Sequence, residues 1–384
     1  MDMLRHALLG AALLCCAAPA SATSARVESL GGGGDYFEDV DNVLRWYGSL
    51  PSYGGTALFE LGEKTSGASI RNRGAAILAE LDRDGAWGTA GMFLFGDNSD
   101  EVIRLAWGRR LGAVRLGIQW KLSWESYGWY DHDASSVGWL DAVDQVFGAG
   151  LRWEMDDRTY LDVAADITEA GREVEMGDAT IEPENFSVET YSWRCRGFHA
   201  LSDATVIVPL VSYDRFLQTA YLSAQDGVYD WDLDAFQAGL GFNHLPDADT
   251  MLVGSFTYGL THDSRAHPRD ESDENRLTAT YHAYDLRLGV ERRLLGWLTL
   301  RAGAWQSLVL HDVVVQESPG GPGVADRSSD EDLDISLGIA LHFGPFDADF
   351  AFQENAPFNF GSFITQAETY EDSTWSRITL QCVF

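Results

Sequence analysis

Hydrophobic and polar residues alternate with a period of two along most of the chain. From Val114 to Glu125 every second residue is large and apolar, and the residues between are polar or glycine. The same pattern recurs in residues 284–291, 333–343, 346–353 and 376–384. Successive side chains of a strand point to opposite faces, so each segment predicts a strand with one apolar and one polar face. The runs reach about ten residues, the length of a tilted membrane-spanning strand.

The connections between these segments alternate between short and long. Tight turns are predicted at residues 82–85, 110–112, 156–157, 202–203, 246–247, 294–296 and 344–345. Longer acidic or Gly- and Pro-rich loops are predicted at residues 126–139, 169–184, 217–230, 263–277, 316–329 and 355–373. Alternation of this kind predicts an all-β fold, a transmembrane up-and-down antiparallel barrel with short periplasmic turns and long acidic outer loops. With a first strand near residues 56–62, we expect about 16 strands, within bounds of 14–18.

Composition and charge exclude several other classes of protein. The 384 residues carry a formal net charge of −32, yet 45% of them are hydrophobic, too many for a disordered acidic chain. So acidic a chain lacks the basic footprint that nucleic-acid binding requires. Four cysteines in this length do not make a disulfide scaffold. A mean hydropathy of −0.16, with no long apolar run after the N-terminus, argues against a helical membrane protein.

The N-terminal residues predict a secreted protein. Residues 1–22 have the features of a signal peptide, with Arg5 before an apolar stretch and Ala20-Ser21-Ala22 as the cleavage site. Residues 23–54 then predict a periplasmic linker and a short helix, and residues 55–384 the barrel. Val40, Val43, Leu44 and Tyr47 stand at helical spacing. This helix is expected either as a plug packed in the lumen or as a lid or frayed end on the periplasmic side.

Two segments resemble known families. The last residues, 375–384, end in Phe384 with apolar residues at every second position upstream, and they resemble the C-terminal insertion signal of bacterial outer-membrane β-barrel proteins. That resemblance implies insertion by the barrel-assembly machinery and localisation in the outer membrane. Residues 45–55, with the sequence RWYGSLPSYGG, resemble the barrel entry of the long-chain fatty-acid transporter family.

The alternation also assigns charged residues to the inner face of the barrel. Charges that face lipid at the bilayer midplane cost about 2–4 kcal/mol for a basic residue, so these side chains are expected to line the lumen. They form either a constriction that selects ions by sign or a closely paired interior in which they stabilise one another. Acids outnumber bases among them, which predicts a weak cation preference. The predicted lumen-lining residues are Arg115, Lys121, Glu125, Arg152, Glu154, Asp162, Asp166, Asp285, Arg287, Glu291, Arg301, Asp334, Asp347, Asp349 and Arg377.

One predicted outer loop, residues 126–139, is rich in aromatic and acidic side chains. General porins fold their third loop into the lumen, and this loop is the third by the predicted strand order. Its aromatic residues are expected either to stack against a solute or to form part of the interfacial aromatic girdle. The candidate residues are Tyr127, Trp129, Tyr130, Asp131, His132 and Asp133.

Catalytic and metal sites find weaker support. His-Asp pairs stand at His132, His262 and His311, which allows a rim hydrolase or a metal site as an alternative, but strand parity puts His282 and His311 on opposite faces. No enzyme activity, resident metal or cofactor is therefore predicted. The acidic outer loops are expected to hold divalent cations that bridge to lipopolysaccharide. Cys195 and Cys382 fall in distant strands, so no disulfide between them is expected.

These observations predict a passive outer-membrane porin for small polar solutes or ions. The expected partners are outer-membrane lipid and lipopolysaccharide, the assembly machinery and small solutes, and a homotrimer would be in keeping with other porins. Two alternatives stay open: a plugged barrel that transports hydrophobic substrates, with residues 35–53 as its hatch, and a structural barrel without transport.

Overall fold

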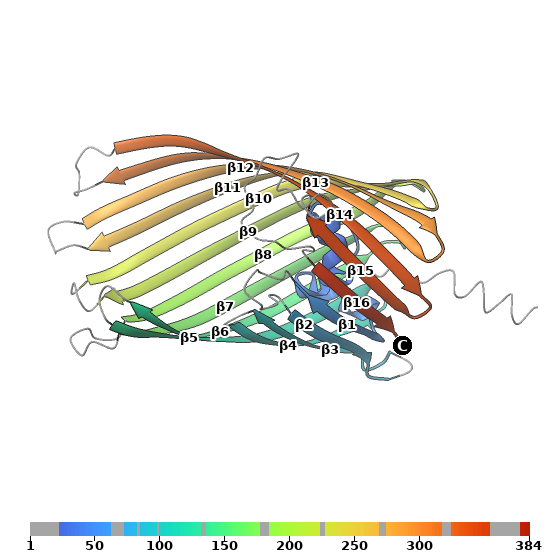
Figure 1. Cartoon of the computed structure of the whole chain (residues 1–384), viewed down its shortest axis with the longest axis horizontal. Coiled ribbons are helices and arrows are strands. Elements are labelled where there is room, and N and C mark those ends of the chain that lie inside the picture. Colours follow the sequence, from blue (N-terminus) through green and yellow to red (C-terminus); the bar gives the residue numbers. More distant parts are fainter. Residues whose placement is uncertain are drawn as a thin grey trace, which may run out of the picture.

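The computed structural model is a closed antiparallel β-barrel in which each strand pairs with its neighbours in sequence (Figure 1). It describes residues 23–62, 73–82, 85–97, 100–131, 136–176, 184–222, 227–268, 274–316, 324–353 and 377–384. The ring contains sixteen described strands and closes where β1 pairs with β16, with Thr56 opposite Val383 and Leu61 opposite Ile378. The predicted fold class and strand number are confirmed. The predicted signal peptide, residues 1–22, lies outside the described residues.

The strands have the following bounds. The first eight are β1 (Thr56–Leu61), β2 (Arg73–Glu80), β3 (Thr89–Asp97), β4 (Asp100–Leu111), β5 (Val114–Asp131), β6 (Ser136–Glu154), β7 (Tyr160–Met176) and β8 (Glu184–Ser202). The second eight are β9 (Thr205–Leu222), β10 (Gly227–Asp247), β11 (Thr250–Pro268), β12 (Glu274–Leu295), β13 (Leu298–Gln316), β14 (Val324–Phe343), β15 (Phe346–Gln353) and β16 (Arg377–Val383). The seven predicted tight turns fall at or beside strand ends.

The strands from β5 to β14 are longer than the sequence pattern predicts. β12 has 22 residues and β10 has 21. The predicted outer loops are wrong in extent, because residues 126–131 and 136–139, for example, belong to β5 and β6. The outer halves of these strands carry polar residues on both faces, as in Asp330-Glu331-Asp332 of β14, while backbone pairing to β13 continues. Side-chain alternation therefore stops before the backbone ladder does. The predicted loop 355–373 lies outside the described residues.

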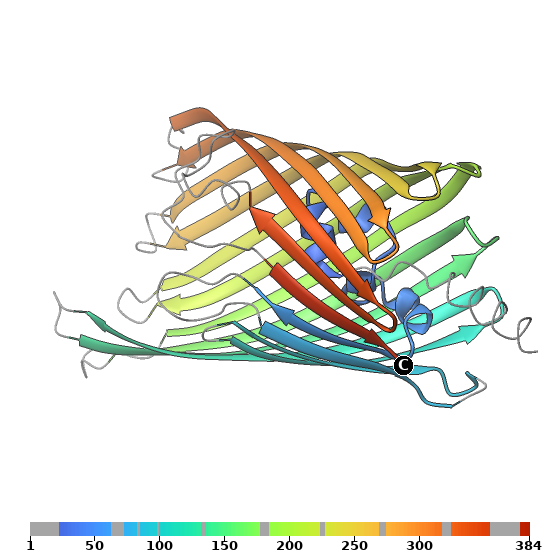
Figure 2. The same cartoon turned by 45° about the vertical axis from the view of Figure 1, so that its right-hand side comes forward.

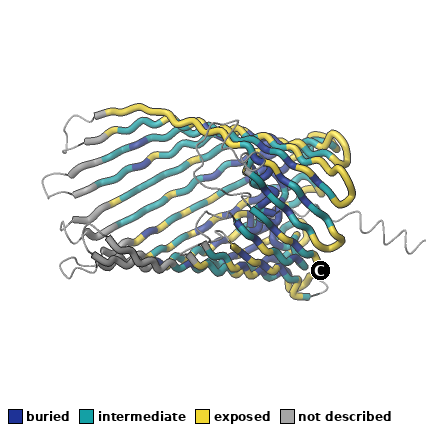
Figure 3. The backbone as a smooth tube through the Cα atoms, in the orientation of Figure 1, coloured by how far each residue is buried: buried dark blue, intermediate teal, exposed yellow. Residues whose placement is uncertain are grey.

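The outer face of the barrel is apolar. Ile118, Phe147, Leu240, Phe256 and Leu288 are each about half exposed. Exposed positions recur along the strands (Figure 3). Such an exposed apolar belt is the arrangement that a lipid environment stabilises.

Aromatic and aliphatic residues gather at the barrel end that carries the tight turns, which we call the short-turn end. Trp87, Trp297, Phe343, Phe346 and Phe384 are all exposed there. Aromatic side chains are favoured where a membrane meets water.

Cys195 and Cys382 are both free. None of the helices in the described ranges is long and apolar enough to cross a membrane.

Residues 23–55, which we call the plug, lie inside the barrel toward its short-turn end (Figures 1 and 2). The plug contains α2 (Ser24–Ser29) and the 3-10 helices η2 (Gly34–Tyr36), η3 (Val40–Leu44) and η4 (Tyr47–Ser52). α2 contacts β13–β16, η2 contacts β9–β11, and η4 contacts β3–β7. The helix predicted from Val40 to Tyr47 is therefore two short 3-10 helices. Of the two expected positions, the structure has the segment in the lumen.

The hydrophobic core of the protein is the interface between the plug and the barrel wall. Trp46 and Leu50 of the plug are each 1% exposed, and Phe93 of β3 is 2% exposed. Trp46 belongs to a buried cluster with Tyr160, and Leu50 belongs to a second cluster with Phe93. The buried positions accordingly gather around the plug (Figure 3).

Candidate functional site

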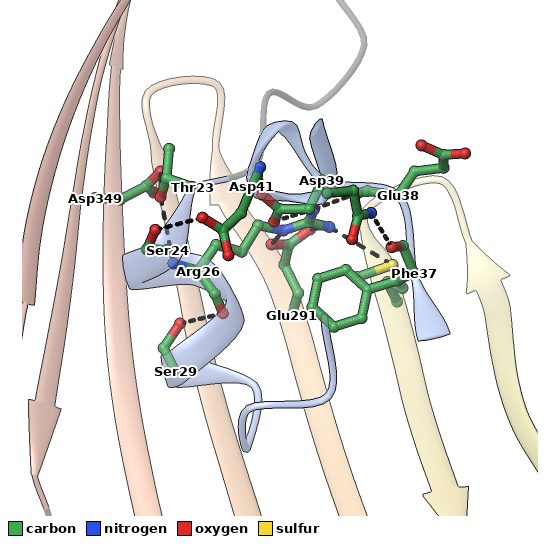
Figure 4. Close-up of polar contacts among 12 residues, drawn as sticks. Thr23, Ser24, Arg26, Ser29, Phe37, Glu38, Asp39, Asp41, Glu291 and Asp349 are labelled. Carbon is green, nitrogen blue, oxygen red and sulfur yellow. Dashed lines mark hydrogen bonds and ion pairs between the residues drawn. The ribbon is translucent and has the colours of Figure 1, made fainter. Parts of the chain in front are cut away.

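A buried network of ion pairs fixes α2 to β12, β13 and β15. Figure 4 shows the plug residues of this network with Glu291 and Asp349. Arg26 donates from Nε and Nη2 to the two carboxylate oxygens of Glu291, at 2.7 and 3.1 Å. Arg301 donates to the same carboxylate at 2.6 Å and to Asp349 at 2.6 Å. Thr23 of the plug donates to the second oxygen of Asp349 at 2.8 Å. Two arginines and two carboxylates thus join the plug to three strands.

Asp39 is a third carboxyl group beside this network. It is 1% exposed, its Oδ2 lies 3.9 Å from Arg26 without a hydrogen-bond donor, and its Oδ1 accepts the backbone N–H of Asp41 at 2.9 Å. Burial raises the pKa of Asp39 well above its usual range, and the charge of Arg26 offsets this only in part. A protonated Asp39 leaves Arg26 and Arg301 balanced by Glu291 and Asp349. Docking of the plug therefore favours the protonated form of Asp39.

A second network joins Glu38 of the plug to β6, β7 and β8. Arg152 donates to Glu38 at 2.8 Å and to Asp162 at 2.7 and 2.8 Å, and the Tyr160 hydroxyl also donates to Glu38. Arg196, which is fully buried, donates to Asp162 at 3.0 Å. Burial acts to raise the pKa of Glu38, but Arg152 and Arg196 lower it below its usual value.

Further contacts hold the plug along its outer-facing side. Asp166 of β7 accepts the Tyr47 hydroxyl and the guanidinium of Arg194. Arg377 of β16 donates to Glu28 at 3.0 Å, and Arg287 of β12 donates to the backbone carbonyl of Gly32 at 2.6 Å.

The wall carries glycines where the plug backbone approaches it closely. A Cβ atom at Gly117 would lie 1.9 Å from the carbonyl oxygen of Tyr47, and one at Gly303 would lie 2.2 Å from the backbone nitrogen of Gly31. Real Cβ atoms do not approach so closely, so the inner surface matches the plug only because side chains are missing there. The other inward glycines within 3.2 Å of the plug by this measure are Gly108, Gly148, Gly150, Gly239, Gly241, Gly289 and Gly338.

The predicted lumen residues divide by what they contact. Direct plug contacts are made by Arg115, Arg152, Asp166, Arg287, Glu291, Asp349 and Arg377. Partners on the wall are found for Glu154, Asp162, Asp285, Arg301 and Asp347. Lys121 stands opposite Arg104 on β4, and Asp334 stands opposite Trp305 on β13. Much of the predicted inner charge is therefore engaged by the plug.

The aromatic loop candidates are placed only in part. Tyr127, Trp129, Tyr130 and Asp131 belong to β5 and not to a loop, which corrects the prediction, because the ladder to β6 continues to Asp131. Their side chains, that of Glu125, and all of His132 and Asp133 lie outside the described residues.

The histidines do not converge. His282 lies on the outer face and shares a hydrogen bond of 2.9 Å with the hydroxyl of Tyr258. His311 lies on the inner face, and its Nε2 is 3.0 Å from Oδ2 of Asp330. Within the described ranges, no three His, Cys, Asp or Glu side chains come together as metal ligands.

Several functional wall residues were missed by sequence reasoning. Arg194, Arg196 and Tyr160 all contact the plug or its ion pairs. A signal was present, because Trp193 and Cys195 alternate with the two arginines and so place them on the opposite, inner face. The Gly-x-Gly pairs at 148–150 and 239–241 were a second signal.

Two cavities lie between the plug and β1–β4. The larger, of about 550 Å³, is lined by Leu44, Phe95, Val102 and Arg104, and also by Arg377, Glu28, Asp41 and Glu60. The smaller, of about 20 Å³, is a seam lined mostly by apolar residues, among them Val40, Leu58 and Phe93. The plug therefore meets these strands largely through apolar side chains, together with Asp41 of the plug and Glu60 of β1, which line both cavities.

The fold and the site together define a class of protein. A closed barrel with an apolar outer belt, an aromatic rim and its own N-terminal segment in the lumen is a plugged transmembrane β-barrel of the bacterial outer membrane. The short-turn end is its periplasmic end.

Comparison with known proteins adds the following. No protein-family model and no curated protein sequence matches the chain. Among solved structures it is similar to the toluene transporter TodX of Pseudomonas putida, with 12% identity, 94% of this chain and 97% of that chain covered, and a TM-score of 0.45. It is also similar to the ferric-catecholate import receptor Fiu of E. coli K12, with 9% identity, 86% and 81% covered, and a TM-score of 0.42. At these values the likeness concerns barrel architecture alone.

Proposed function

We propose that the protein is a gated transport barrel, in which the plug closes the periplasmic end and cargo passes only when part of the plug moves. The observation that carries the proposal is the set of plug contacts around the wall, in which Arg26 binds β12, Glu38 binds β6 and β7, and Tyr47 binds β7. This supports the plugged barrel over the passive porin, which stays a prediction. A structural barrel would also be closed, so the test must measure opening.

The apolar seam along β1–β3 is the part of the interface that can separate at least cost. Val40, Leu44 and Phe93 meet there, and apolar surfaces that part leave no unpaired charge behind. By contrast, separation at Arg26 would leave buried charges without partners. We therefore place the moving boundary at this seam, which also supports apolar groups in the cargo.

Single-channel conductance in a planar bilayer tests closure. We expect the mature chain to be closed with brief openings, and a variant lacking residues 23–53 to show stable, large conductance steps. Equal, stable conductance steps from both proteins would contradict the proposal and would support a passive porin instead. A deletion variant that is folded but silent would favour a structural barrel.

A reversible crosslink tests movement without removing the plug. A Cβ atom at Gly33 would lie 3.8 Å from Oγ of Ser255 on β11, so Gly33→Cys with Ser255→Cys can form a disulfide, in a background with Cys195→Ser and Cys382→Ser. Because the moving boundary is placed at the β1–β3 seam, we expect the brief openings to persist after oxidation. The single-cysteine variants serve as controls. Openings that oxidation abolishes and reduction restores would show that the η2 region moves, and would overturn this placement.

A weak cation preference remains a separate prediction for the opened barrel. Asp330, Asp332 and Asp334 form an acidic row on the inner face of β14 above the plug. The reversal potential of the variant lacking residues 23–53 in a KCl gradient should therefore show excess potassium permeability. Chloride preference would show that the arginines of the wall control selectivity instead.

A further inference from the structure

Three arginines surround Tyr47 on the outer-facing side of the plug. Arg45 belongs to the plug, Arg104 to β4 and Arg194 to β8. The Tyr47 hydroxyl and Arg194 bind the same carboxylate, that of Asp166, and Arg104 donates to the carbonyl of Leu44, next to Arg45, at 3.5 Å. We call Arg45, Tyr47, Arg104 and Arg194 the floor cluster.

The carboxylates in contact with the floor cluster balance only part of its charge. Asp35 accepts from Arg45 at 2.5 Å, and Asp166 accepts from Arg194. Arg104 makes no ion pair with any described residue, and its Nε is buried without a hydrogen-bond partner. A cation–π contact with Phe95, at 6.0 Å, is among its few contacts. A buried N–H donor with no acceptor among the described residues calls for an acceptor from outside them.

The neighbouring positions strengthen the positive field. Arg104 stands directly opposite Lys121 on β5, with both on the inner face, so two basic side chains are neighbours there. Burial raises the pKa of Tyr47, while Arg194, Arg104 and Arg45 act together against that rise. Burial also acts to raise the pKa of Asp35, but Arg45, Arg196 and Arg194 lower it below its usual value.

There is room for a ligand beside the floor cluster. Arg104, Leu44 and Arg377 line the 550 Å³ cavity between the plug and β1–β4, and Glu28, Asp41 and Glu60 also line it, so an anion there has to lie at the side of Arg104. Arg45 is 53% exposed, so part of its guanidinium stays available after binding Asp35. The planar guanidinium fork matches the oxygens of carboxylates and phosphates.

We propose that the floor cluster binds an oxyanion, the carboxylate or phosphate group of a small solute, with Arg104 as its main anchor and Arg45 and Arg194 beside it. Such a site is unexpected in a chain with a net charge of −32. It would hold an anion that has passed the acidic mouth of the barrel. The role of the site as a station for cargo rests on the proposed transport function, whereas binding itself does not.

Calorimetric titration of the refolded mature chain in a non-ionic detergent tests the site. Sodium benzoate and sodium phosphate are the two probes, at constant ionic strength with sodium chloride as the reference. We expect saturable binding of at least one probe with a stoichiometry of one. Tighter binding of benzoate identifies a carboxylate ligand, and tighter binding of phosphate identifies a phosphorylated one. Absence of saturable binding for both would overturn the proposal.

Arg104→Gln is the decisive variant. Loss of a charged hydrogen-bond donor should weaken binding by tenfold or more. Arg104→Lys keeps the positive charge but lacks the planar guanidinium. Its affinity for the probe should therefore lie between those of the wild type and Arg104→Gln. Arg110→Gln is the matched control, because Arg110 lies on the same strand and face but at the short-turn end, where it contacts Glu154 at 2.9 Å. Equal losses in Arg104→Gln and Arg110→Gln would show a diffuse charge effect and overturn the site.

The two proposals fail separately. Stable open conductance of the wild-type chain with intact anion binding would end the gating proposal and leave the site in place. Brief openings that depend on the plug, without anion binding, would do the reverse.

Discussion

Replacing Gly117 with alanine should loosen the plug and open the barrel. The new methyl group would lie 1.9 Å from the carbonyl oxygen and 2.3 Å from the carbonyl carbon of Tyr47, so backbone must move. Overpacking of this kind costs about 1–3 kcal/mol. The outer belt and the strand ladder of the barrel are not involved, so the barrel should still form. We expect the brief openings of the wild-type chain to become frequent or lasting in single-channel recordings.

Gly259→Ala supplies the control for this prediction. Gly259 also faces the lumen, on β11, but a Cβ atom there would lie 3.5 Å from Cβ of Ala283, an ordinary contact, and meets no plug atom. The conductance of the Gly259→Ala variant should equal that of the wild type. If Gly117→Ala were as closed as Gly259→Ala, the plug would have to accommodate the methyl group by a local shift, and the close approach would not hold the barrel shut.

The barrel itself could be predicted from the sequence because its pattern is local. Alternation from Val114 to Glu125 assigns a face to each side chain without knowledge of any partner strand. Strand ends toward the outside were harder to predict. In β14 the residues from Asp330 to Asp334 are mostly acidic on both faces, and only pairing with β13 keeps them in the sheet.

The plug could not be derived in the same way. Its short helices have no lasting period, and the partners of Arg26 and Glu38 are 265 and 114 residues away in sequence, so tertiary contacts alone fix them. The inward charges were predicted as a pore lining, whereas Glu291 and Arg152 in fact bind plug residues. Glycines that replace side chains on the inner face, such as Gly303, carried the clue that something packs there.

The ion network around Arg26 leads to the other large effect. Glu291→Gln would leave Arg26 and Arg301 sharing an uncharged partner in a buried site, and breaking a buried pair from one side costs about 3–5 kcal/mol. Native-state hydrogen exchange of α2 amides measures the free energy of plug opening directly. We expect that free energy to fall by this amount in Glu291→Gln.

Asp39→Asn should act in the opposite direction. The pKa of Asp39 is raised in the docked plug, so the docked state binds a proton that the released state gives up near the usual carboxyl pKa of about 4. This contribution is fully present below that value and is lost as the pH rises through the raised pKa. Asparagine stays neutral at every pH and can still accept the N–H of Asp41. Asp39→Asn should therefore strengthen docking at pH 8 more than at pH 5, when both proteins are measured by exchange of the same α2 amides. A loss as large as that of Glu291→Gln, at both pH values, would mean that Asp39 is ionised and serves as a third anion for Arg26.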